Sequence, residues 1–142
     1  MKLRGFSFIE LIIVIAIIGI LSTVLSVSVG SIRQRARNAQ RATDISSILN
    51  AVYQYALDND NQVPLAITTA TTTICRTTAP SCTGFINLST LTTNQKYLIA
   101  IPTDPLSTST SNTNYTIVKN AIGRITVSAP NAEASTTISI TR

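Results

Sequence analysis

GFSFIELIIVIAIIGILSTVLSVSV, from Gly5 to Val29, is the stretch that decides the fold of this chain. From Leu11 to Ile32 the sequence holds 22 consecutive residues without a formal charge. At ~1.5 Å of rise per residue, a helix over this run is roughly 33 Å long, enough to cross the ~30 Å hydrocarbon core of a bilayer. The run therefore predicts a membrane-spanning helix.

Glu10 is the residue that a plain membrane anchor does not need. It lies just inside the apolar run, between Ile9 and Leu11. An ionised side chain at the centre of a bilayer costs roughly 2.5–3.5 kcal/mol on insertion scales, and somewhat less near the edge. We therefore expect another group to compensate this carboxylate, and we interpret Glu10 as a functional residue.

A short basic leader precedes the run. Met1–Gly5 carries two positive charges, Phe6 follows at once, and Glu10 is the fifth residue after the Gly5–Phe6 bond. Together these features resemble the type IV prepilin signal. The resemblance implies cleavage between Gly5 and Phe6 by a prepilin peptidase, N-methylation of Phe6, and a role for Glu10 in filament assembly. It also implies an assembly platform and ATPase, other pilins and copies of the chain itself as partners.

Two other interpretations of the run stay open. A secretory signal peptide would be cut near Ser26 or Ser28, although its apolar region normally spans only ~7–15 residues. An uncleaved single-pass anchor would leave Glu10 without a purpose. The distribution of positive charge also conflicts with a cytoplasmic N-terminus, because Lys2 and Arg4 precede the run and four arginines follow it: Arg33, Arg35, Arg37 and Arg41. We follow the leader motif, since a dedicated export pathway can override a charge bias.

The composition limits the classes of function. A chain of 142 residues allows one small domain outside the membrane run. The net charge is +5, and the chain contains no histidine, which excludes a Ser–His–Asp triad and imidazole metal sites. The acidic turn after Asp58 lacks the glycine and the later acid of a calcium loop. We predict no enzymatic activity, no cofactor and no metal.

The two cysteines bracket a short Thr-rich segment. Cys75 and Cys82 enclose CRTTAPSC, and an even pair in an exported domain is typical of a disulfide. Two reduced thiols without a role are the alternative. The spacing is not CxxC, so a redox-active pair is not indicated.

The helix is expected to continue beyond the membrane run. No proline interrupts the sequence from Phe6 to Gln62, and small or apolar residues recur on one helical face at Ala42, Ile45, Leu49, Val52 and Ala56. Arg33, Arg37 and Arg41 repeat every four residues on another face, which is either solvated or in contact with lipid or a filament. We expect Arg41 to pair with Asp44 at i+3.

The remainder, residues 63–142, predicts a small β domain. Tyr115–Val118 and Arg124–Ala129 predict a hairpin, and the alternation over Ser135–Thr141 predicts a third strand. A fourth strand is possible near Thr71–Cys75. Asp104 lies between two prolines in a segment that predicts a rigid turn. Neither Asp104 nor Glu133 has a visible partner base, so nothing in the sequence supports an anchored enzyme.

The predicted fold is α+β, with a long N-terminal helix and a small antiparallel sheet packed on its outer half. We expect a leader at residues 1–5, a transmembrane or filament-core half at 6–32, an outer half at 33–62 and a globular domain at 63–142. The resemblance implies a structural subunit of a type IV pilus, inserted in the cytoplasmic membrane before assembly and in a surface filament afterwards. The alternatives are a pseudopilin of type II secretion in a periplasmic filament, or a minor pilin that binds DNA or a surface ligand.

Overall fold

The computed structural model describes residues 5–142, and the side chains of residues 5–23 and 29–142 among them. Residues 1–4 of the expected leader lie outside the described residues. The chain divides into two compact units, Met1–Arg35 and Ala36–Arg142, which are described separately.

One helix, α1 (Phe8–Asp58), accounts for most of the first unit and continues into the second. It ends before Gln62, where the sequence predicted its end, because Asp60 and Asn61 adopt positive φ angles of 52° and 61°. These left-handed conformations are tolerated by Asp and Asn and cannot continue a right-handed helix. Within the described residues, no helix combines the length and the apolar character that a membrane span requires.

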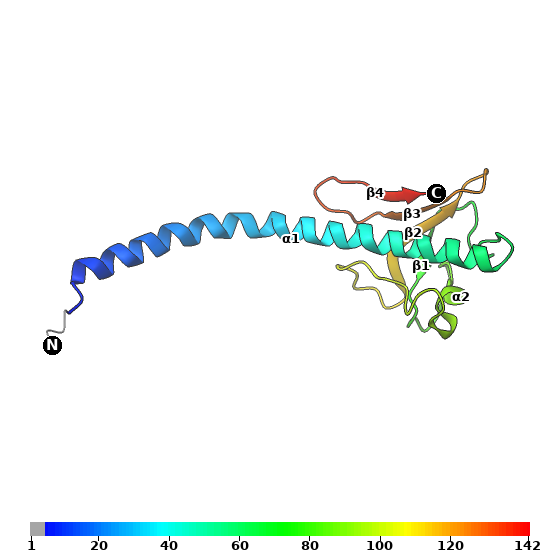
Figure 1. The fold of residues 1–142 in the computed structure, drawn as a ribbon, viewed down its shortest axis with the longest axis horizontal. Helices are drawn as coiled ribbons and strands as arrows, with labels where there is room; N and C mark the ends of the chain where they lie inside the picture. Colours follow the sequence, from blue (N-terminus) through cyan, green and yellow to red (C-terminus); the bar gives the residue numbers. More distant parts are fainter. Residues whose placement is uncertain (1–4) are drawn as a thin grey trace. The chain divides into compact units, whose positions relative to one another are not determined.

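The second unit contains a four-stranded antiparallel sheet beside its part of α1 (Figure 1). Its strands follow one another in space in chain order: β1 (Thr72–Cys75), β2 (Asn112–Lys119), β3 (Ile125–Ala129) and β4 (Ile138–Thr141). The predicted hairpin is confirmed as β2 and β3, and the two further predicted strands are β4 and β1. The α+β class is likewise confirmed.

A single hydrophobic core joins the helix to the sheet in this unit. Ile45, Leu49 and Val52 from α1 are buried, as the predicted stripe requires. Strands β2 and β3 alternate, with inward residues fully or nearly fully buried: Thr113, Tyr115, Ile117, Ile125, Val127 and Ala129. The register that pairs Ile117 with Val127 places these side chains on one face. The predicted stripe was wrong at Ala42, which is exposed.

Between β1 and β2 the chain forms one short helical segment and a long loop. The helical segment consists of α2 (Ser89–Thr92) followed by the 3₁₀ turn η1 (Thr93–Gln95). Before it, Ile86 forms a parallel bridge with Ile74, and its backbone N–H donates to the carbonyl of Thr73 over 2.9 Å. These contacts cover the outer edge of β1.

Candidate processing and assembly site

Gly5 and Phe6 lie immediately before α1. Ser7 follows them and occupies the position just ahead of the first helical residue, Phe8. The Phe6 side chain is 83% exposed. No Cβ built on Gly5 would come within 4 Å of another group. The Gly5–Phe6 peptide bond, where we expect cleavage, is therefore in an exposed, non-helical segment.

Glu10 lies in the first turn of α1 and has a local partner. Its carboxylate oxygen Oε2 accepts a hydrogen bond from the backbone N–H of Ser7 over 2.9 Å. In the capping-box pattern Ser-x-x-Glu, the glutamate reaches back in this way to an N–H that the helix cannot pair. A negative charge at this end also interacts favourably with the helix dipole.

The sequence reasoning missed this contact. We expected a compensating group for Glu10 and did not consider one three residues away. Ser7–Phe8–Ile9–Glu10 is itself the signal that could have revealed it, because it places a serine and a glutamate at the spacing of a capping box. The structure thus assigns to Glu10 a structural role that coexists with any role between subunits.

The rest of the first unit presents apolar side chains to solvent. Every large hydrophobic residue described between Phe6 and Leu21 is at least 41% exposed. No charge interrupts them after Glu10. An exposed apolar surface of this kind and extent marks contact with lipid or with other protein surfaces.

Comparison with known families identifies this segment. A family model described as the prokaryotic N-terminal methylation motif matches residues 1–26. The chain carries the N-terminal methylation motif. This motif is the signature of type IV pilins and prepilins, so the N-terminal segment is of prepilin type. The motif implies processing by a prepilin peptidase and assembly with other pilins into filaments. No curated protein and no solved structure gives a significant match to the chain.

The second unit, which begins at Ala36, contains a cluster of charged side chains. We call Arg37, Asn38, Arg41, Asp104 and Glu133 the ion-pair cluster. Arg41 Nε donates to Asp104 Oδ2 over 2.6 Å, and Arg41 Nη1 donates to Glu133 Oε2 over 2.9 Å. Arg37 donates to both carboxylate oxygens of Glu133, over 2.7 and 2.6 Å. One helix face is thus connected to two loops.

Asn38 completes the ion-pair cluster on the same face of α1. Its side-chain Nδ2 donates to the carbonyl of Glu133 over 2.9 Å, and its Oδ1 accepts the N–H of Glu133 over 3.0 Å. The backbone and the carboxylate of Glu133 are therefore both held. The loop between β3 and β4, which contains Glu133, has a fixed position along the helix.

The electrostatics of the ion-pair cluster follow from these bonds. Hydrogen bonds from Arg37 and then Arg41 lower the pKa of Glu133 to about 2. The bond to Asp104 raises the pKa of Arg41 above its ordinary value, against the opposing effect of burial. Since the Arg41 side chain is completely buried, its charge is balanced inside the protein by two carboxylates rather than by water.

Three expectations are corrected here. Arg41 does not pair with Asp44, because its guanidinium is directed into the second unit toward Asp104. Asp44 instead accepts a hydrogen bond from the buried Tyr115 hydroxyl over 2.7 Å. Asp104 and Glu133, which had no visible partner base in the sequence, are the partners of the two arginines. Arg41 is therefore not part of a solvated or lipid-facing row.

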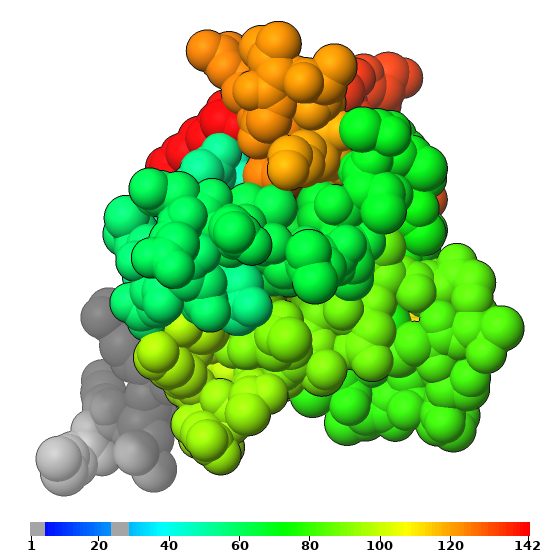
Figure 2. Space-filling view, turned by 90° about the vertical axis from the view of Figure 1, so that its right-hand side faces the viewer, coloured from blue at the N-terminus to red at the C-terminus, as the bar shows by residue number. Residues whose placement is uncertain are grey.

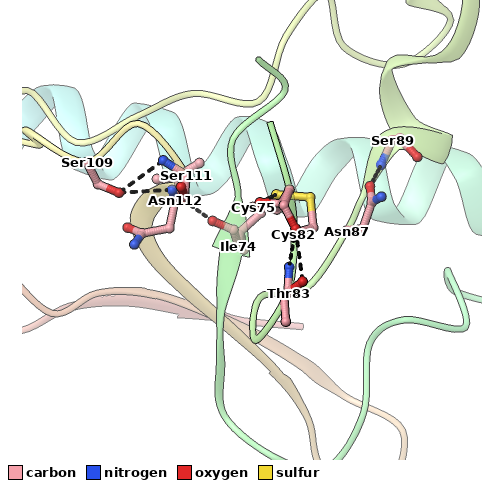
Figure 3. The surroundings of a disulfide bond; sticks show 11 residues. Ile74, Cys75, Cys82, Thr83, Asn87, Ser89, Ser109, Ser111 and Asn112 are labelled. Carbon is pink, nitrogen blue, oxygen red and sulfur yellow. Dashed lines mark hydrogen bonds between the residues drawn. A yellow bond between two sulfur atoms is a disulfide. The ribbon is translucent and has the colours of Figure 1, made fainter. Parts of the chain in front are cut away.

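The Cys75–Cys82 disulfide is present, with a Cα–Cα distance of 5.5 Å. Cys75 ends β1 and is buried, so the bond attaches the following loop to the edge of the sheet (Figure 3). On the other side of β1, the Thr113 hydroxyl donates to the carbonyl of Ile74 over 3.1 Å. The N–H of Arg76 donates to the carbonyl of Ser111 over 3.0 Å. The disulfide thus closes a loop whose base is already held on β2.

Proposed function

We propose that this chain is a processed structural subunit of a type IV pilus. Cleavage after Gly5, methylation of the new Phe6 amine and helix packing in a filament core are the steps we assign to it. The exposed apolar surface that begins at Phe6 and contains one acid, Glu10, is the observation that carries the proposal. This surface supports the proposal because it suits a segment that is buried first by lipid and then by neighbouring subunits.

We place the subunit in the cytoplasmic membrane before assembly and in a surface filament afterwards. The 22 uncharged residues from Leu11 to Ile32 support the first location. The disulfide supports the second, because such bonds form and persist outside the cytoplasm. A type II secretion pseudopilus would use the same subunit chemistry in the periplasm.

A minor pilin that captures DNA is supported less well. The arginine row was the proposed electrostatic footprint for DNA, which requires exposed charges for phosphate contacts. Arg41 is buried, and Arg37 is engaged with Glu133. Two of the four arginines after the apolar run are therefore occupied within the second unit, and this observation favours a structural role for them.

Two measurements on the wild-type protein test the proposal. Mass spectrometry of membrane-extracted protein should find a chain that begins at methylated Phe6. Electron microscopy of material sheared from cells should find filaments that contain the chain. A chain that begins at Met1, or near Val29, would contradict the proposal. Filaments confined to the periplasm would favour the pseudopilin alternative.

A further inference from the structure

A pocket lies where the end of α1 meets the segment of α2 and η1. In Figure 2 the teal-green end of α1 lies above the yellow-green segment that follows η1, and residues of both line the pocket. It is a surface pocket open to solvent, with a volume of about 490 Å³. None of the residues proposed for processing or filament assembly lines it, so the inference below does not depend on that function.

Two tyrosines form the aromatic part of the pocket. The rings of Tyr55 and Tyr97 meet edge to face, with centroids 5.7 Å apart. The ammonium group of Lys96 lies 4.9 Å from the centroid of Tyr97 and covers one face of that ring. Tyr55 is half-buried and lines the pocket together with Tyr97. An aromatic face of this kind packs against the C–H groups of a flat, partly apolar molecule.

Charged groups are fixed beside these rings. Asp58 accepts hydrogen bonds from Lys96 Nζ over 2.7 Å and from the Tyr97 hydroxyl over 2.9 Å. Both charged side chains are about half exposed, at 58% for Lys96 and 47% for Asp58. The hydrogen bond from Lys96 lowers the pKa of Asp58, which keeps the carboxylate ionised. A strong acceptor and a strong donor thus lie side by side at the mouth of the pocket.

The backbone at the rim is in an unusual conformation. Asn94, which lines the pocket, has a φ of 53°, and Gln95 beside it has a φ of 55°. Consecutive non-glycine residues rarely adopt this left-handed region. Two other consecutive pairs among the described residues, Asp60–Asn61 and Ala134–Ser135, adopt the same conformation away from the pocket lining. At the rim, Asn94 presents an amide side chain next to the aromatic and charged groups.

We propose that this pocket binds a neutral saccharide, with Tyr55 against an apolar face of one sugar ring and the Asp58–Lys96 pair hydrogen-bonded to its hydroxyl groups. Each hydroxyl is both donor and acceptor, so a fixed carboxylate beside a fixed ammonium matches neighbouring hydroxyls. Phosphorylated or sulfated ligands are disfavoured, because Asp58 offsets the one lysine that lines the pocket. The same balance argues against nucleic acid, whose binding depends on unopposed positive charge.

The test uses the full chain in micelles of a detergent without a sugar headgroup, because such a headgroup would compete. Cellotetraose, chitotetraose and maltotetraose are titrated separately, and binding is followed by calorimetry and by NMR. We expect at least one tetrasaccharide to bind with a Kd of about 1 mM or tighter. Tyr55→Leu and Asp58→Asn should each weaken that binding by at least about tenfold.

Two variants separate binding from folding. Tyr53→Leu removes another half-buried tyrosine from α1 that does not line the pocket, and it should leave binding unchanged. Thr90→Trp places a large side chain at an exposed lining position, and it should abolish binding while the melting temperature stays at the wild-type value. The proposal fails if none of the tetrasaccharides shows saturable binding, or if binding survives in Tyr55→Leu and Thr90→Trp. Tighter binding of heparin or single-stranded DNA than of every tetrasaccharide would also overturn it.

Discussion

Arg41 and Asp104 form an ion pair across 63 residues of sequence, with Nε and Oδ2 separated by 2.6 Å and both side chains almost completely inaccessible. Asp104 also accepts the N–H of Leu106 over 2.8 Å, so its carboxylate holds the turn at Pro105. The segment that the sequence predicts as a rigid turn is therefore rigid and also attached to the helix. Attachment through a buried charge depends on both partners being present.

Removing one partner of this pair should strongly lower the free energy of unfolding. Breaking a buried ion pair by truncating one side destabilises a protein by about 3–5 kcal/mol, because the other charge stays buried and uncompensated. We expect Arg41→Met or Asp104→Asn to lower the free energy of unfolding of a fragment beginning at Arg33 by about this amount. The double variant Arg41→Met with Asp104→Leu should recover part of the loss. Urea denaturation followed by circular dichroism measures all of them, and Arg33→Met, at an exposed position, is the matched control.

The pKa of Glu133 predicts an acid-sensitive contribution to stability. Hydrogen bonds from Arg37 and Arg41 lower this pKa from its usual 4.5 to about 2 in the folded protein. The contribution is therefore complete above about pH 4.5 and is lost as the pH falls toward about 2. The denaturation midpoint of the wild type should drop across this window, and that of Glu133→Gln should drop less.

The pKa of Asp44 is shifted in the opposite direction. Burial raises its pKa, so protonation of Asp44 on acidification favours the folded state. The difference between wild type and Glu133→Gln, rather than either curve alone, isolates Glu133. Parallel curves from pH 5 to pH 2 would contradict the assignment.

A pair of substitutions can separate the two roles of Glu10, capping of the helix and charge pairing between subunits. Glu10→Gln keeps an oxygen that can accept the Ser7 N–H but removes the charge, whereas Glu10→Val removes both. If the carboxylate pairs with the Phe6 amine of a neighbouring subunit, both variants should be cleaved after Gly5, and neither should form ordered filaments. Electron microscopy of sheared material provides the measurement. Normal filaments from Glu10→Gln and none from Glu10→Val would mean that capping, not charge pairing, is what assembly requires.

Gly5 should be needed for processing. A side chain at this position adds bulk next to the bond that we expect to be cut, and a peptidase at a membrane surface needs close approach to the backbone. We expect Gly5→Leu to retain its leader, which raises the mass by that of residues 1–5 and leaves Phe6 unmethylated. Ser7→Ala, one residue past Phe6, should be processed normally. A mature, methylated Gly5→Leu chain would refute the expectation.

Loss of the disulfide should destabilise mainly the loop that it closes. In the chain-entropy treatment, a ring of eight residues contributes about 2.5 kcal/mol. Cys75→Ser should therefore lower the melting temperature of the fragment beginning at Arg33 by roughly 10–20 °C, because a domain of about 100 residues loses about 4–8 °C per kcal/mol. Amide exchange should accelerate in residues 76–85 and stay unchanged in the middle of β2 and β3. An unchanged melting temperature would mean that the disulfide does not stabilise the fragment.

The sequence predicted those features that depend on short-range pattern. The helix, the hairpin of β2 and β3 and the alternating β4 all follow from periodicity, which each segment carries within itself. The ion-pair cluster could not be predicted in this way, because Arg41 meets Asp104 and Glu133 across 63 and 92 residues. Our expectation of an Arg41–Asp44 pair considered only neighbours on the helix surface, and tertiary contacts decided otherwise. The capping contact of Glu10 could have been predicted from the sequence, since it depends on four consecutive residues.

The ion-pair cluster also has a mechanical consequence. Arg37 and Arg41 are the two arginines near the start of the second unit, so a pulling force transmitted along α1 reaches the loops of this unit through their ion pairs. Hydrophobic contacts resist sliding only weakly, because they are non-directional. The two carboxylates hold the arginines in defined directions from two different loops, one before β2 and one between β3 and β4. In a filament under tension, the helix could slide past its sheet only after these hydrogen-bonded ion pairs break. The ion-pair cluster is therefore the part of the second unit that we expect to resist the pulling force.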